Sequence, residues 1–165
     1  MAIAAAFLTA GLAAAGPATA AERPIYFGAG AAVQSLVGGE DGLATVVKGG
    51  AMLDGAAPGL GVEGEFTRSL IDPEAGRGRD VTFTTLGGYL VYAVPFPDRR
   101  VSLRARLGLL WKEVEPEGGN DDTDLEISWG VGGEYRITNE LSAFIEHTRI
   151  DSSLNQLSGG LMVRF

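Results

Sequence analysis

The chain has a single histidine, His147, whose side chain is the first candidate for catalysis. An imidazole can take a proton from a serine hydroxyl while a carboxylate orients the ring, and this arrangement would make an esterase. The nearest following serines, Ser152 and Ser153, lie in an expected loop. The alternative is a histidine on the apolar face of a strand. The sequence favours the alternative, and we predict no catalytic residue and no enzyme activity.

An acidic segment, residues 113–124, is the second candidate. Its residues Asn120, Asp122 and Asp124 alternate like the first oxygen ligands of a calcium loop. The glycine and the later bidentate glutamate that complete such a loop are missing. The segment equally fits a hairpin loop that its charge keeps soluble. We predict no resident metal, and weak contact with divalent cations stays open.

Four arginines are expected near the end of the structure where the longer loops lie. Guanidinium groups pair well with phosphate, so they are candidates for contact with a phosphate-bearing ligand. Simple rim charge is the other interpretation, and both stay open. These arginines are Arg68, Arg77, Arg79 and Arg149.

The composition limits the class of protein. A chain of 165 residues is long enough for one domain, and it contains no cysteine for disulfides or thiolate metal sites. Its 13 basic and 21 acidic residues give a net charge of −8, which disfavours a nucleic-acid partner. No cofactor is predicted.

The first 21 residues contain no charged side chain and end in the small residues Ala18, Thr19, Ala20 and Ala21. This pattern predicts a cleaved signal peptide over 1–21, followed by one domain over 22–165. No basic residue precedes the apolar run, so the true start of translation could lie upstream. A membrane-anchor helix is the competing interpretation, and Pro17 together with the abundance of alanine and glycine disfavours it.

After the signal segment, apolar and polar residues alternate with a period of two, as in half-buried strands. The expected connections alternate in length along the chain. Those at 54–58, 95–100 and 137–140 are short, and those at 35–43, 70–79 and 114–123 are longer. Strands of about ten residues with this alternation of turns and loops are typical of transmembrane barrels. We therefore predict an all-β fold, an eight-stranded antiparallel up-and-down transmembrane barrel. The expected strands lie near 25–33, 45–53, 60–66, 81–93, 101–112, 125–136, 141–150 and 157–165.

The polar face of these strands carries nearly equal numbers of positive and negative side chains. A narrow interior needs such balance, since an unpaired buried charge costs several kcal/mol. We expect this face to point inward and to form an ion-pair network that plugs the lumen. The alternative is a soluble barrel with the tryptophans in its core. The predicted lumen residues are Lys48, Glu63, Glu65, Arg104, Arg106, Glu126, Glu134, Arg136, Glu146 and Arg164.

The apolar face carries large aromatic residues toward its ends. Aromatic rings favour the level of the lipid headgroups, so these residues predict two girdles at the membrane interfaces. In the seventh strand, the expected outward placement of His147 turns Phe144 and Glu146 inward, where lumen glycines would leave room for the ring. The predicted girdle residues are Phe27, Phe66, Phe83, Tyr89, Trp111, Trp129 and Tyr135.

The final residues, Met162 to Phe165, resemble the terminal signal of outer-membrane barrels, whose last Phe the barrel-assembly machinery recognises. The stretches 61–68 and 146–151 look like strands of the OmpA/OmpX-like outer-membrane β-barrel superfamily, also called porin-family barrels. The resemblance covers about 23–165. It implies a barrel of a Gram-negative cell outer membrane, exported through the periplasm, and mostly without an open pore.

The resemblance also implies partners and alternative functions. The expected partners are outer-membrane lipid, lipopolysaccharide and the barrel-assembly machinery, and the expected state is a monomer. Some members mediate adhesion or serum resistance, which fits a structural or surface-interaction role. The outer-membrane lipid A deacylases carry a serine two residues after their catalytic histidine, where this chain has Arg149. A lipid-modifying enzyme and a narrow pore remain the alternative functions.

Overall fold

The computed structural model describes residues 25–37, 41–53, 55–71, 74–75, 79–97, 100–116 and 122–165. The expected signal peptide at 1–21 lies outside these residues. Among them, no helix is long and apolar enough to cross a membrane. The strands are β1 (Ile25–Leu36), β2 (Asp41–Met52), β3 (Leu60–Ile71), β4 (Glu74–Ala75), β5 (Arg79–Pro95), β6 (Val101–Pro116), β7 (Asp122–Arg136), β8 (Leu141–Arg149) and β9 (Leu154–Arg164).

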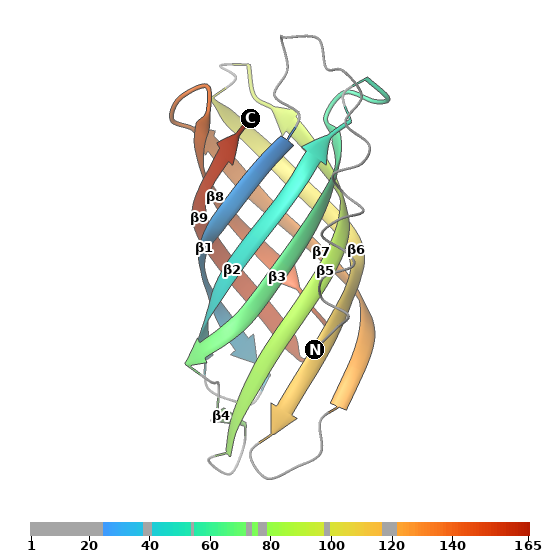
Figure 1. Cartoon of the computed structure of the whole chain (residues 1–165), viewed down its shortest axis with the longest axis vertical. Coiled ribbons are helices and arrows are strands. Elements are labelled where there is room, and N and C mark those ends of the chain that lie inside the picture. The colour runs from blue at the N-terminus through green and yellow to red at the C-terminus, as the bar shows by residue number, and fades with distance from the viewer. Residues whose placement is uncertain are drawn as a thin grey trace.

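The strands close into an antiparallel barrel (Figure 1). Their order is β3-β2-β1-β9-β8-β7-β6-β5-β4, and a further pairing between β3 and β5 completes the ring. The short β4 lies outside that ring and pairs only with the start of β5. Eight strands therefore form the wall, and the predicted fold class is confirmed.

Alternation along each strand separates two surfaces. The outward side chains are large and apolar, and several of them are more than half exposed, such as Leu107 at 57% and Ile127 at 71%. The inward side chains include charged and polar groups that are almost fully buried, such as Lys48 and Glu65. This inside-out distribution is the one that a lipid-facing barrel requires.

The faces of β5 are the reverse of those that the predicted girdle positions of Phe83 and Tyr89 imply. Thr85, Tyr89 and Val91 are buried inside the barrel, whereas Leu90 and Tyr92 point outward. Both faces of this strand carry apolar residues, so its own sequence does not mark the outward one. The neighbouring strands decide, because directly paired residues share a face of the sheet. Tyr89 pairs with the inward Glu63 of β3, and the prediction of a girdle position for Tyr89 is wrong.

The two ends of the barrel differ in their connections. Short turns join β2 to β3, β5 to β6 and β7 to β8 at the end where the chain terminates (Figure 1). There the amide of Phe165 donates to the carbonyl of Ile25 at 2.9 Å, so the start of β1 lies beside the end of β9. At the opposite end β5, β6 and β7 run farther than predicted. Much of the acidic segment 113–124 is therefore strand, and β6 and β7 still pair at Val114 and Asp122.

Glycines on β1 and β9 let the wall accommodate an inward aromatic ring. Gly30 pairs with Gly160, and Gly160 pairs in turn with Phe144 of β8. Phe144 is 6% exposed and lies in a buried cluster with Tyr26 and Met162. A Cβ atom placed on Gly30 would lie 2.1 Å from the carbonyl oxygen of Gly159, so a larger residue cannot enter without moving the backbone.

We predict that Gly30→Ala destabilises the barrel by about 1–3 kcal/mol, the usual cost of forcing an extra group into a packed site. Urea unfolding in detergent micelles, followed by tryptophan fluorescence, measures the change. Gly88→Ala is the matched control, because a Cβ on this outward glycine would have no atom within 4 Å. Equal losses in the two variants would contradict the close approach at Gly30.

Candidate functional site

The most concentrated chemistry of the molecule is a cluster of charged side chains inside the barrel. Each of its members is no more than 4% exposed. They come from four strands far apart in the sequence, and the alternation of each strand points them inward. We call this group the lumen cluster, and it consists of Lys48 from β2, Glu63 and Glu65 from β3, Arg104 and Arg106 from β6, and Glu146 from β8.

Glu63 is held from one side by Arg104 and Tyr26. Nη2 of Arg104 donates to Oε2 of Glu63 at 2.7 Å, and the Tyr26 hydroxyl donates to the same oxygen at 2.8 Å. Nη2 of Arg104 also donates to the Tyr26 hydroxyl at 3.0 Å. Because all three groups bond to one another, none of them can move alone.

Glu65 and Arg106 form the two-pronged pair that guanidinium and carboxylate geometry allows. Nη1 of Arg106 lies 2.6 Å from Oε2 of Glu65, and Nη2 lies 3.1 Å from Oε1. Nη2 also donates to the hydroxyl of Thr148. The guanidinium carbon stands 4.2 Å from the centre of the Tyr89 ring, which adds a cation–π contact.

Lys48 links the two halves of the lumen cluster. Its Nζ lies 2.8 Å from Oε1 of Glu146 on the far wall, 3.4 Å from Oε2 of Glu65 and 3.7 Å from Oε1 of Glu63. The ammonium group also stands 4.4 Å from the centre of the Phe144 ring. A single cation therefore bridges strands on opposite sides of the barrel.

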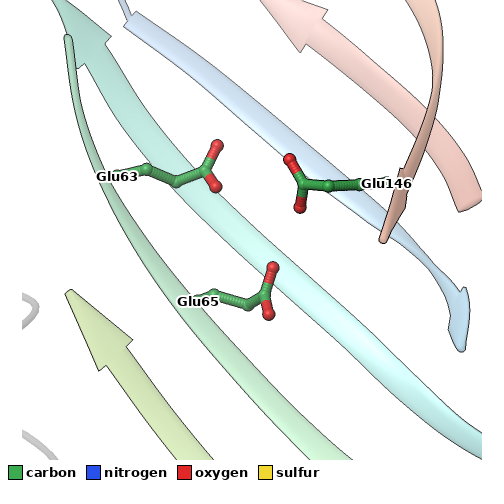
Figure 2. A group of neighbouring side chains, drawn as sticks. All are labelled: Glu63, Glu65 and Glu146. Atoms are coloured by element: carbon green, nitrogen blue, oxygen red, sulfur yellow. The ribbon is translucent and has the colours of Figure 1, made fainter. Parts of the chain in front are cut away.

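The carboxylates of Glu63, Glu65 and Glu146 converge on one another across the interior (Figure 2). Oxygens from all three lie within 4.8 Å of one another, which is the spacing of a metal-binding group. Lys48 and Arg106 meet these same oxygens, since Nη1 of Arg106 lies 2.6 Å from Glu65 and 2.9 Å from Glu146. Protein cations thus supply the positive charge that three converging carboxylates need.

Further ion pairs lie nearer the two ends, and the one at the turn end joins the lumen cluster, because Oε2 of Glu134 lies 3.8 Å from Nη1 of Arg104. At the turn end, Nη1 of Arg164 lies 2.6 Å from Oε1 of Glu134. At the loop end, Lys112 pairs with Asp151. Partial burial raises the pKa of Asp151, but hydrogen bonds from Lys112 and Ser153 outweigh it and lower that pKa to about 2.

Two predicted lumen residues do not join these pairs. Arg136 is exposed at the end of β7, where the strand leaves the barrel, so its placement in the lumen was wrong. Glu126 is partly buried and makes no ion pair among the described residues. Its part of β7 extends past the end of β8, so the wall beside it is incomplete there. Alternation gives the face of a residue but not its height along the barrel.

Most predicted girdle residues lie on the outward surface, between 39% and 49% exposed: Phe27, Phe66, Trp111, Trp129 and Tyr135. The terminal Phe165, predicted as the assembly signal, is also exposed. The side chain of Phe83 lies outside the described part of the structure. Tyr92 and Phe96 are also outward-facing. The prediction missed Tyr92 because it took the opposite face of β5, and it missed Phe96 because it placed that residue in the connection 95–100.

Sequence reasoning also missed inward polar residues that join the network. Tyr26, Gln34 and Gln156 are buried, and Nε2 of Gln156 donates to Oε1 of Glu65 at 3.4 Å. Each lies on the strand face opposite to the apolar residues. Their position on that face was a usable signal, but the predicted ion-pair network included charged residues alone.

The other candidate chemistry is dispersed. His147 is exposed on the outer surface and the neighbouring Glu146 points inward, so the two adjacent side chains lie on opposite sides of the wall. Of the calcium-like residues only Asp124 is described with its side chain, and it is exposed. Among the rim arginines, Arg68 and Arg149 are exposed, whereas Arg77 lies outside the described residues and Arg79 is described by its backbone alone.

Solved structures of other outer-membrane proteins share this architecture. Neisserial surface protein A is 23% identical, with a TM-score of 0.62 over 86% of this chain and 97% of its own. Ail, the attachment invasion locus protein of Yersinia pestis, is 15% identical, with a TM-score of 0.58 over 86% and 97%. The N-terminal β-barrel domain of Pseudomonas aeruginosa OprF is 10% identical, with a TM-score of 0.60 over 85% and 97%. At such identities the likeness establishes the fold alone.

The family follows from the sequence itself. No curated protein matches the chain. A family model described as the outer membrane protein beta-barrel domain matches residues 3–165. This match agrees with the closed ring of strands, the apolar exterior and the ion-paired interior. The chain belongs to the outer membrane protein beta-barrel family, and its location is the outer membrane.

Proposed function

We propose that this protein is a closed structural barrel of the outer membrane, with a lumen plugged by side chains and loops that serve in contacts at the surface. The observation that carries the proposal is the lumen cluster. Three cations and three carboxylates from four strands are buried together and paired at close range. Eight strands leave only enough interior space for side chains, so a paired cluster of this size leaves little room for ions to pass.

The balance of charge supports a permanent plug. Lys48, Arg104 and Arg106 carry three positive charges, and Glu63, Glu65 and Glu146 carry three negative ones. A neutral cluster has no excess charge to attract mobile ions, and each member has a partner that offsets its cost of burial. A conducting path would have to separate these pairs in a medium of low dielectric constant.

The proposal includes the surroundings of the barrel. The apolar exterior suits outer-membrane lipid and lipopolysaccharide, and the outward Phe165 at the end of β9 is accessible to the barrel-assembly machinery during folding. We propose a monomer, because the ring of strands is complete within one chain. We also propose that the protein catalyses no reaction, since His147 and Glu146 lie on opposite sides of the wall.

We predict that Glu65→Gln lowers the free energy of unfolding by about 3 kcal/mol, the usual loss when one partner of a buried ion pair is removed. Urea unfolding in micelles measures the change. The control is Glu126→Gln, which removes an acid without an ion pair among the described residues, and it should change stability by less than about 0.5 kcal/mol. A loss as large in the control as in Glu65→Gln would argue against a special role for the cluster.

We also predict that the purified protein gives no steady, large current in planar lipid bilayers. A double variant, Glu65→Ala with Arg106→Ala, keeps the net charge but removes two long side chains from the plug, and it should show frequent current steps. The control is Leu107→Ala with Leu109→Ala on the outward face of β6, the strand that carries Arg106, and it should show no current. Large, steady currents from the unaltered protein would refute the closed lumen.

A further inference from the structure

The barrel wall has a step between β7 and β8. Pairing of these strands runs from Arg136 opposite Ser142 to Trp129 opposite Arg149, where β8 ends. β7 continues to Asp122 and stays paired with β6 over that whole length. One edge of β7, residues 122–128, therefore lacks a neighbouring strand among the described residues. The Ser128 hydroxyl donates to the carbonyl of Arg149 at 2.9 Å where the pairing stops.

A groove of about 410 Å³ occupies this step. Leu125, Ile127 and Trp129 form its apolar wall, with exposures of 67%, 71% and 45%. Arg149 and Ser152 lie at its polar border. The groove thus combines an apolar surface with a polar border on which Arg149 is the one cation.

Two acids, Asp151 and Glu126, also line the groove, and neither makes an ion pair with Arg149 in the described part of the chain. Asp151 is paired with Lys112, and its other oxygen accepts hydrogen bonds from Ser153 and Leu154. Glu126 reaches the groove from the inward face of β7, opposite to the face of Leu125 and Ile127, with which it alternates.

Arg149 is exposed, and its side chain makes no ion pair or hydrogen bond within the described part of the chain. It is the one charged side chain among the described outward-facing residues of β7, β8 and β9. An exposed cation without an ion-pair partner in the described part of the chain, at the border of an apolar groove, favours an anionic, amphipathic ligand.

The height of the groove indicates what surrounds it. On β8 and β9 the outward residues change here from apolar, such as Ile145 and Leu157, to polar, such as Arg149 and Asn155. Such a change marks the boundary between the hydrocarbon layer and the headgroups. On β7 the apolar residues continue past Trp129 into the headgroup level, where acyl chains and phosphates meet. The groove lies at the loop end, which faces the outside in barrels of this kind.

We propose that the groove between β7 and the end of β8 binds the lipid part of lipopolysaccharide. Its acyl chain lies on Leu125, Ile127 and Trp129, and its phosphate pairs with Arg149. The unpaired edge of β7 offers backbone N–H groups to the remaining headgroup oxygens. This inference deepens the lipid contact proposed above and rests on the barrel standing in the membrane, but it does not depend on a closed lumen.

Trp129 provides the test. In a Trp111→Phe background it is the only tryptophan, and brominated phosphatidylcholine in the vesicle quenches it by contact. Adding lipopolysaccharide should displace the brominated lipid and restore fluorescence. Lipopolysaccharide stripped of its phosphates should be about fivefold less effective at restoring the fluorescence, since one arginine near an anionic surface contributes about 1 kcal/mol to binding.

Matched variants complete the design. Arg149→Gln should abolish the fivefold difference, whereas Arg136→Gln, an exposed arginine at the other end of the barrel, should preserve it. Glu126→Gln should preserve or enlarge it. Heat-dependent migration on gels checks that each variant is folded.

Three results would overturn the proposal: no recovery of fluorescence with lipopolysaccharide, an unchanged difference in Arg149→Gln, or equal recovery with unbrominated phosphatidylglycerol. Recovery only with an extended peptide added to the vesicles would instead assign the step to strand addition. Current measurements stay independent, so a leaky barrel that keeps its lipopolysaccharide preference would refute the closed lumen and leave this site standing.

Discussion

The lateral hydrogen bonding that closes the sheet is the constraint on which the rest of the structure depends. In a hydrocarbon layer no water satisfies backbone N–H and C=O groups, so each strand of the wall needs a neighbour on both sides. The pairing of β1 with β9 joins the two ends of the chain, and that of β3 with β5 completes the ring. The start of β7 is a described stretch of wall without a second neighbour, and it lies at the level where water and headgroups return.

Closure with eight strands fixes what the interior can hold. The lumen admits side chains alone, and its members must fit in size as well as in charge. Gly30 and Gly160 face each other where Phe144 projects inward, while Arg106 fills the space beside Tyr89. Small and large residues therefore complement one another across the barrel. The lumen cluster follows from the same geometry, because it brings side chains of β2, β3, β6 and β8 to one level.

Much of this could be read from the alternation of the chain. Strands with charged residues on one face, such as β6 with Arg104 and Arg106, revealed their orientation directly. β5 did not, because Tyr89 and Val91 on one face and Leu90 and Tyr92 on the other are all apolar or aromatic. The positions of Glu126 and Arg136 along the barrel axis could not be predicted either, since a period-two pattern carries no information about where one strand ends relative to the next.

The sequence by itself determined the membrane class, the number of wall strands and the inward position of most charged residues, because these depend on local alternation and on the lengths of the connections. Only the tertiary structure decided which charges pair, which face of β5 lines the lumen and where β7 extends past the end of β8. Those outcomes depend on the register between strands. Register is set by contacts among residues far apart in the chain, such as Lys48 with Glu146, and no local pattern records them.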